Sequence, residues 1–218
     1  MELLYLLPGA FFAPMIHELT KAVTSTAQGD PTPRNRGFLT LNPFKFFEPI
    51  GFLMMLFFGG FGWGQPVPTA ALHYKNRRQG VLITHLAPVA VNLLVGFAAI
   101  MALSLWVGAT QDASLDAFLF IRRLFILSAE WDAVMIGKLV LFAFAQCNIL
   151  LAFFNLLPVH PLAMSKIIQL YAKPDTLVKL NHYEKPMQII LILLLVFGAV
   201  AMIFTPVWNT ILRMAWVA

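Results

Sequence analysis

The chain has 218 residues and a formal net charge of +5, and 60% of its residues are hydrophobic while only 11% are charged. An ordinary soluble domain has about 25% charged residues, and a soluble protein of this size has too little interior to hide so much apolar surface. The composition therefore excludes a typical soluble enzyme and predicts a single integral membrane domain over residues 1–218. No basic face typical of nucleic-acid binding is visible, so the expected surrounding is membrane lipid and nucleic acid is not an expected partner.

Four apolar stretches are candidates for membrane-spanning helices, each of which needs about 20 residues. They cover approximately residues 3–26, 81–107, 139–157 and 187–205. A further apolar stretch at about 50–61 is too short for a span and is typical of a re-entrant segment. Before it, the sequence GFLTLN at 37–42 alternates loosely and predicts a short strand-like element. Together these stretches predict an all-α polytopic membrane protein with a short strand-like or re-entrant element.

The distribution of basic residues favours this topology. If the stretch at 50–61 re-enters, one side of the membrane holds eleven of them: Lys21, Arg34, Arg36, Lys45, Lys75, Arg77, Arg78, Lys166, Lys173, Lys179 and Lys185. The other side holds four: Arg122, Arg123, Lys138 and Arg213. Because basic residues concentrate on the cytoplasmic side, the first side is predicted to be cytoplasmic and both termini extracytoplasmic.

The dipeptide His17–Glu18 lies inside the first predicted span, where ionisable side chains are unfavourable unless they are paired. It matches the first half of the zinc signature H-E-x-x-H, in which two histidines on one helix face bind the ion. The second histidine position holds Lys21, whose ammonium has no lone pair to donate. The residues alone leave two interpretations open: half of a zinc site, or an interfacial helix end whose polar side chains reach lipid headgroups.

Five stretches in chain order extend this pattern. They are IHELTKA, QGDPTPRNRGFLTLNPFKFFEPIG, GGFGWGQPVP, HLAPVAVNLL and NILLAFFNLLPVHPLAMS, and they cover about residues 10–166. Together they resemble the site-2 protease family of intramembrane zinc metalloproteases, in its short bacterial form. The resemblance implies a site-2-protease-like transmembrane helix core, in the plasma membrane of a bacterium, where the H-E-x-x-H helix faces a helix end that carries a third, aspartate ligand.

The resemblance also assigns roles to single residues. His17 matches the first metal ligand and Glu18 the general base. Lys21 replaces the second ligand, while Ala163 and Met164 replace the aspartate ligand and the glycine after it. Since catalytic zinc needs three protein ligands, we expect a vestigial site without a cofactor. Glu18 and Lys21 are three residues apart on one helix face and are predicted to pair.

Other residues are predicted to form a substrate-like groove. The resemblance places Asn92 and Asn155 along it. Equally, buried amides of this kind bridge membrane helices through hydrogen bonds. Gly37, Leu39 and Asn42 belong to the strand-like segment, whose edge would offer main-chain groups to an extended peptide.

The sequence therefore predicts a non-catalytic pseudoprotease that binds a transmembrane helix or a membrane complex. One alternative is an active intramembrane metalloprotease that holds zinc with unorthodox ligands such as His17 and His160, with His85 as a third. The ordinary interpretation of His160 is a satisfied polar residue at a helix mouth, and that of His85 an interfacial one. Another alternative is a structural subunit of a larger membrane assembly.

Overall fold

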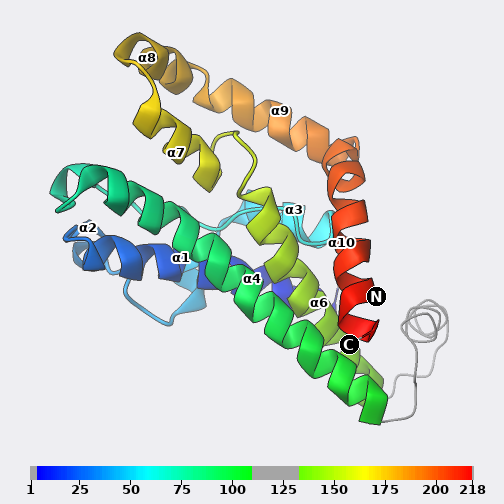
Figure 1. Ribbon diagram of the computed structural model, residues 1–218. Coiled ribbons are helices and arrows are strands. Elements are labelled where there is room, and N and C mark those ends of the chain that lie inside the picture. The colour runs from blue at the N-terminus through cyan, green and yellow to red at the C-terminus, as the bar shows by residue number, and fades with distance from the viewer. Residues whose placement is uncertain (1–3, 110–132, 218) are drawn as a thin grey trace.

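The computed structural model describes residues 4–109 and 133–217, and the regular elements within these ranges are all helical (Figure 1). The α-helices are α1 (Leu7–Ala27), α2 (Thr32–Asn35), α3 (Pro49–Phe57), α4 (Arg77–Ala109), α6 (Ala133–Phe154), α7 (Ala163–Tyr171), α8 (Pro174–His182), α9 (Glu184–Val196) and α10 (Ala199–Val217). Two short 3-10 helices, η1 (Pro43–Phe46) and η2 (Ala71–His73), lie in the connections. The predicted all-α class is confirmed for the described residues.

The centre of the molecule is a bundle of α1, α4 and α6, which pack against one another in all three pairs. Small residues allow the backbones to approach closely, as is usual between membrane helices. A Cβ atom on Gly9 of α1 would lie 2.9 Å from the carbonyl oxygen of Ala143 on α6. A Cβ atom on Gly96 of α4 would lie 3.2 Å from the carbonyl oxygen of Ala145. The backbones of α1 and α4 therefore both approach α6 closely at these glycines.

Among the described residues, two helices are long and apolar enough to cross a membrane, α4 over Arg77–Val107 and α6. The pair α9 and α10 adds a third if it is counted as one span, although the two helices are bent by 63°. The bend follows Gly198, whose φ of +75° a side chain rarely adopts. Helix α1 does not meet the same test of apolar character. These helices fit a membrane protein, while the count of four spans stays a prediction.

The prediction of a strand-like element at residues 37–42 is wrong, because this part of the chain forms a turn and bends rather than an extended strand. The Phe38 amide donates to the carbonyl of Pro33 at 2.8 Å, which folds the chain back on α2. The Asn42 side chain accepts from the Phe44 amide at 3.1 Å and so caps η1. Local hydrogen bonds thus use groups that a ladder with a neighbouring strand would need.

The connection between α1 and α4 begins at the C-terminal end of α1 and later returns to that same end. The carboxylate of Asp30 accepts hydrogen bonds from the Thr32 amide at 2.9 Å and from the Ala70 amide at 2.7 Å. Between these points, α3 packs beside the N-terminal half of α1, where Ala10 and Met55 share a buried cluster. Helix α3 has nine residues and is about 14 Å long, less than half of a hydrocarbon core of about 30 Å. This length fits the short apolar segment predicted at 50–61, whose re-entrant path stays a prediction.

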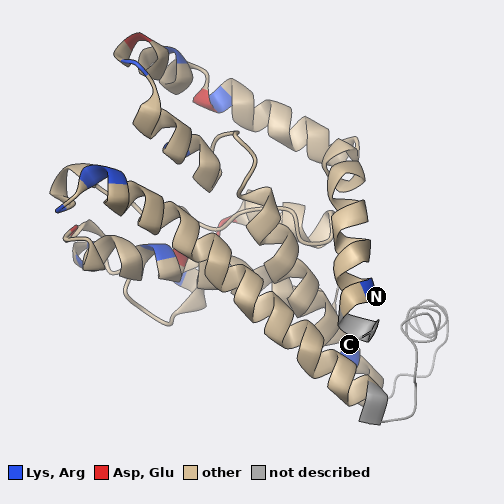
Figure 2. Ribbon diagram, in the orientation of Figure 1, with Lys and Arg blue, Asp and Glu red and all other residues tan. Residues whose placement is uncertain are grey.

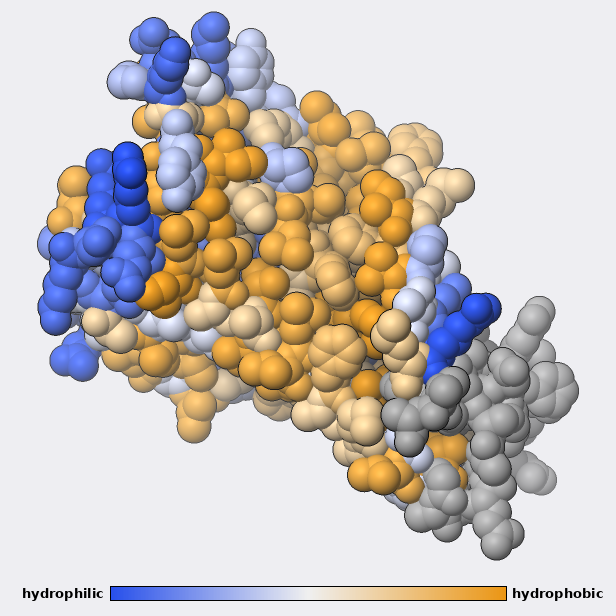
Figure 3. Space-filling model, viewed as in Figure 1, coloured by the Kyte–Doolittle hydropathy of each residue, from blue (hydrophilic) through white to orange (hydrophobic). Residues whose placement is uncertain are grey.

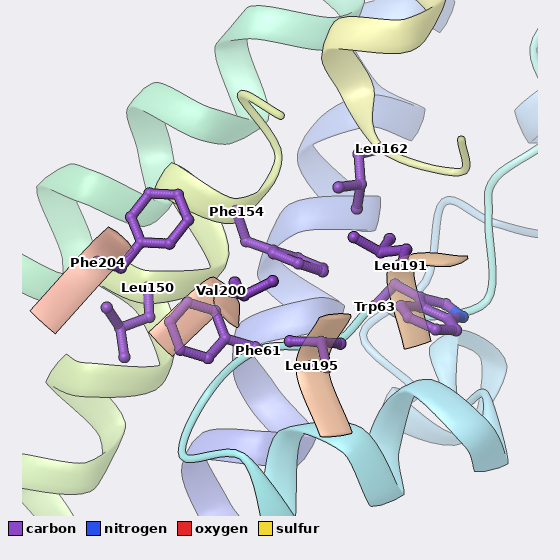
Figure 4. Packing of buried hydrophobic residues seen from close by; sticks show 9 residues of the cluster. All are labelled: Phe61, Trp63, Leu150, Phe154, Leu162, Leu191, Leu195, Val200 and Phe204. Carbon is purple, nitrogen blue, oxygen red and sulfur yellow. The ribbon is translucent and has the colours of Figure 1, made fainter. Parts of the chain in front are cut away.

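The return limb, residues 58–70, fastens α9 and α10 to the bundle. Its Phe61 and Trp63 side chains point into a buried cluster that α6, α9 and α10 complete (Figure 4). The partners from those helices and from the turn before α7 are Leu150, Phe154, Leu162, Leu191, Leu195, Val200 and Phe204. Gly51 of α3 is equally constrained, since a Cβ there would collide with the Trp63 carbonyl oxygen. The limb therefore has little freedom to slide along α1.

Charged residues gather at two ends of the molecule. Figure 2 shows Lys and Arg on α2, at the start of α4 and on α8 at one end, and near the start of α6 and the end of α10 at the other. Between these ends, the face in Figure 3 is mostly hydrophobic. This separation fits a protein embedded in a bilayer. Arg122 and Arg123, two of the four basic residues predicted on the outer side, lie outside the described residues.

The stability of this frame should depend on Asp30. Burial opposes its ionisation, but hydrogen bonds from Thr32, Ala70 and Ser25 outweigh burial and hold the pKa of Asp30 below its ordinary value. Asp30→Asn should therefore lower the free energy of unfolding by about 1–3 kcal/mol at neutral pH, measured by thermal denaturation in detergent. The exposed Asp175 provides the control, since Asp175→Asn should change it by less than about 0.5 kcal/mol.

The effect should also depend on pH with a defined sign. Because the pKa of Asp30 is lowered by folding, its contribution is present above the unfolded-state pKa of about 3.9 and is lost as pH falls below that value. The difference in the free energy of unfolding between the native protein and Asp30→Asn should become smaller on acidification. The role assigned to Asp30 would be contradicted if Asp30→Asn did not change the free energy of unfolding at pH 7, or changed it only as much as Asp175→Asn.

Candidate functional site

A cavity of about 440 Å³ lies between α1, α4 and α7, within the usual size range of small-molecule sites. Several residues singled out from the sequence line it together: His17, Glu18, Lys21, His85, Asn155, His160 and Ala163. Helix periodicity explains the convergence, because residues one turn apart share a face. Helix α4 presents Arg77, Val81 and His85, which follow one another at intervals of four.

Glu18 is buried at the inner wall of the cavity, and its carboxylate already has two partners. The Lys21 ammonium lies 3.3 Å from Oε2, and the Val67 amide of the return limb donates to the same oxygen at 2.8 Å. The side chains of Glu18 and Lys21 are only 9% and 13% exposed. The ion pair predicted from their spacing is present, and it places an ammonium where the zinc signature would place an imidazole.

His17 is held from behind by a chain of amides. Asn92 donates through Nδ2 to the Ala13 carbonyl at 3.1 Å and to Oδ1 of Asn148 at 2.9 Å. Its own Oδ1 is then the acceptor that lies 3.2 Å from Nδ1 of His17. His17 therefore carries a hydrogen on Nδ1, which leaves Nε2 free to accept a proton or a ligand. Asn92 is fully buried, bridges the three helices of the bundle and lies outside the cavity lining.

Asn155 shapes the opposite wall, where α7 begins. Its Oδ1 accepts from the Ala163 amide at 3.2 Å, and its main-chain carbonyl accepts from the Met164 amide at 3.0 Å. The side chain thus satisfies an N–H group that the first turn of a helix leaves unpaired. Ala163 lines the cavity with only a methyl group, at the position that the sequence resemblance matches to an aspartate.

His160 lines the cavity but is paired with the last helices. Its Nδ1 lies 3.3 Å from Oε1 of Glu184, which also accepts from the Lys166 ammonium at 2.9 Å. Burial lowers the pKa of the His160 imidazole, and Glu184 opposes that effect. The contact is close in distance but is not a hydrogen bond, so among the described residues Nδ1 of His160 is buried without a hydrogen-bond partner.

The donor set at the signature does not fit a zinc ion. Of the positions that the sequence resemblance matches to metal ligands, Lys21 offers an ammonium and Ala163 a methyl group, neither of which has a lone pair for a metal. Within residues 4–109 and 133–217, no three His, Cys, Asp or Glu side chains are placed to hold one ion together.

The structure does not bring the predicted docking residues to the cavity. Gly37, Leu39 and Asn42 lie on an exposed turn outside the lining, and the Asn42 side chain is used to cap η1. Conversely, sequence reasoning missed the positions of Arg77 and Lys166, which do line the cavity. The spacing of four between Arg77, Val81 and His85 is the signal that links the first of them to the site.

The comparisons with known proteins agree with the metalloprotease-like pattern. The chain is 30% identical over 201 residues to the putative zinc metalloprotease YwhC of Bacillus subtilis (strain 168), covering 89% of this chain and 81% of that protein. No protein-family model matches the chain. No solved structure matches it significantly. On the extent of that identity, the chain belongs to the family of the putative zinc metalloprotease YwhC.

Proposed function

We propose that this chain is a site-2-protease-like pseudoprotease, which has lost catalysis and binds a transmembrane helix or a membrane complex. The metalloprotease-like family and the five ordered sequence stretches support the first part of the proposal. One observation carries the loss of catalysis, namely the Lys21 ammonium 3.3 Å from the Glu18 carboxylate. In the zinc signature, that carboxylate is the base that acts on a metal-bound water.

The Lys21 ammonium and a metal ion are alternative ways to compensate the negative charge of the Glu18 carboxylate. A carboxylate inside a helix bundle needs a compensating positive charge, because transfer of an isolated charge from water is very unfavourable. Zinc supplies that charge in a working protease of this type, and Lys21 supplies it here. A zinc ion beside Lys21 would face a like charge and would lack two ligands. Both features argue against a hidden metal centre.

Binding of a partner is proposed for the surface beside the vestigial site. The turn that contains Gly37, Leu39 and Asn42 presents large apolar side chains, with Leu41 77% exposed and Phe44 74% exposed. Exposed apolar side chains next to main-chain groups suit a helix or an extended segment within the bilayer. The partner is therefore expected to be a membrane protein that docks against this turn.

The rival function is an active zinc metalloprotease with unorthodox ligands. It is favoured by one observation: His17, His85, His160 and Glu18 line the same cavity. The free Nε2 of His17 adds to it, because a ligand histidine is usually held through its other nitrogen in this way. Metal content separates the two functions.

The native protein should contain well under one zinc per chain, measured by elemental analysis after purification without chelator. The triple variant Lys21→His, Ala163→Asp and Met164→Gly should gain zinc, because it returns the two missing ligands and a flexible backbone after the second. Asn155 would still bind the main chain at position 163, so the new carboxylate should stay near the cavity. Stoichiometric zinc in the native protein, lost in His17→Ala or His160→Ala, would instead favour the active protease.

A control distinguishes a rebuilt site from adventitious metal. The same triple variant with His17→Ala should lose the gained zinc. If the triple variant folds and binds no zinc, the assignment of Ala163 as the third ligand position is wrong.

The multi-pass topology, with both termini outside the cytoplasm of a bacterium, is also proposed. It predicts that cysteines introduced at Arg77 and Lys179 react with an impermeant thiol reagent from one side, and a cysteine at Arg213 from the other. The native Cys147 is fully buried and gives little background. Labelling of positions 77 and 213 from the same side would contradict the proposed topology.

A further inference from the structure

We propose that the cavity between α1, α4 and α7 binds a phosphate group, carried by an anionic lipid headgroup or by a free small phosphate compound. The inference goes beyond the proposed pseudoprotease function. It concerns what the cavity holds, whether or not a partner helix docks beside it.

Positive charge converges on the cavity from three helices. Lys21 of α1, Arg77 of α4 and Lys166 of α7 all line it. Among the described lining residues, Glu18 is the only carboxylate, and Lys21 already neutralises it. Lys166 is paired with Glu184, which lies just outside the lining, so the uncompensated positive charge is that of Arg77, and it suits an anion rather than a metal ion.

Arg77 is the member of this set that is free to bind a ligand. It is exposed at the first residue of α4 and forms no ion pair with any other described residue. Lys166, by contrast, is committed to Glu184 at 2.9 Å. A guanidinium offers a planar fork of donors that matches two phosphate oxygens at once. Arg77 is thus the expected primary contact.

His85 supplies an independent reason to expect a ligand. It lies two turns beyond Arg77 on the same face of α4, is only 8% exposed and lines the cavity. Among the described residues, the buried side-chain atoms without a hydrogen-bond partner belong to Thr84 and His160, not to His85. The ring nitrogens of His85 are therefore accessible from the cavity rather than sealed in the bundle. A phosphate oxygen would be an acceptor for its N–H group.

The size and the walls of the cavity indicate more than a bare phosphate ion. Its volume of about 440 Å³ suits a small organic molecule. Apolar side chains, those of Val67, Val81, Leu170 and Leu177, alternate with the polar ones around it. A phosphate joined to glycerol and the first methylene groups of acyl chains would match both kinds of wall. The cavity also includes the start of α4, at the basic end of the molecule (Figure 2).

The test uses the whole chain in detergent with a zinc chelator present, so that the result does not depend on metal. Binding of dihexanoyl phosphatidic acid and of inorganic phosphate is measured by calorimetry and by ligand-induced thermal stabilisation. Arg77→Gln should weaken binding by about tenfold or more, because it removes charge-assisted hydrogen bonds. Its matched control is Arg78→Gln, which changes the adjacent exposed arginine outside the lining and should leave affinity unchanged.

A second variant predicts a change of the opposite sign. Glu18→Gln removes the lining carboxylate and frees Lys21, so it should strengthen phosphate binding several-fold. A purely structural effect of the substitution would not increase affinity.

The two probes distinguish the source of the phosphate. Binding of phosphatidic acid alone identifies a lipid headgroup site, and binding of both probes identifies a site open to free phosphate compounds. The proposal is overturned if dihexanoylglycerol, which lacks phosphate, binds as well as phosphatidic acid. It is also overturned if neither probe binds, or if the Arg77 and Arg78 variants behave alike.

Discussion

The negative charge of Glu18 inside the helix bundle is the constraint on which the site depends. Its carboxylate is only 9% exposed at the inner wall of the cavity, and it is stable there because the Lys21 ammonium and the Val67 amide approach one of its oxygens. The first partner comes from the next turn of α1 and the second from the return limb of the 30–70 connection. Loss of either would leave a buried charge only partly compensated, which is strongly unfavourable. The Glu18 carboxylate therefore contacts both its own helix, through Lys21, and the distant return limb, through Val67.

Contacts elsewhere in the structure hold α1 and the return limb in the positions that these two interactions of Glu18 require. Asp30 binds both ends of the connection, and Trp63 on the return limb is packed among side chains of α6, α9 and α10. Asn92 and Asn148 fix the other face of α1 through a chain of amide hydrogen bonds that ends at His17. The result is a polar cavity supported by an apolar bundle, in which the Lys21 ammonium rather than a metal ion faces the Glu18 carboxylate.

Much of this arrangement follows from the sequence, and the exceptions have physical causes. The Glu18–Lys21 pair could be predicted because i,i+3 geometry is fixed by the helix. The short α3 could be predicted because the apolar stretch at 50–61 is too short to cross a bilayer. The strand at 37–42 was wrong because alternation does not reveal that Asn42 caps η1 locally. The cavity positions of Arg77 and Lys166 depend on how α4 and α7 are rotated against α1, and hydropathy does not encode that rotation.

A double-mutant cycle on the free energy of unfolding tests most directly whether Lys21 replaces a metal as the partner of Glu18. The cycle compares Lys21→Met, Glu18→Gln and the double variant in detergent with a chelator present. The account predicts that Lys21→Met alone destabilises the protein by about 3 kcal/mol, because it leaves Glu18 buried and unpaired. Adding Glu18→Gln should recover much of that loss. Effects that add to within about 0.5 kcal/mol would show that the two side chains are not coupled and would contradict the account.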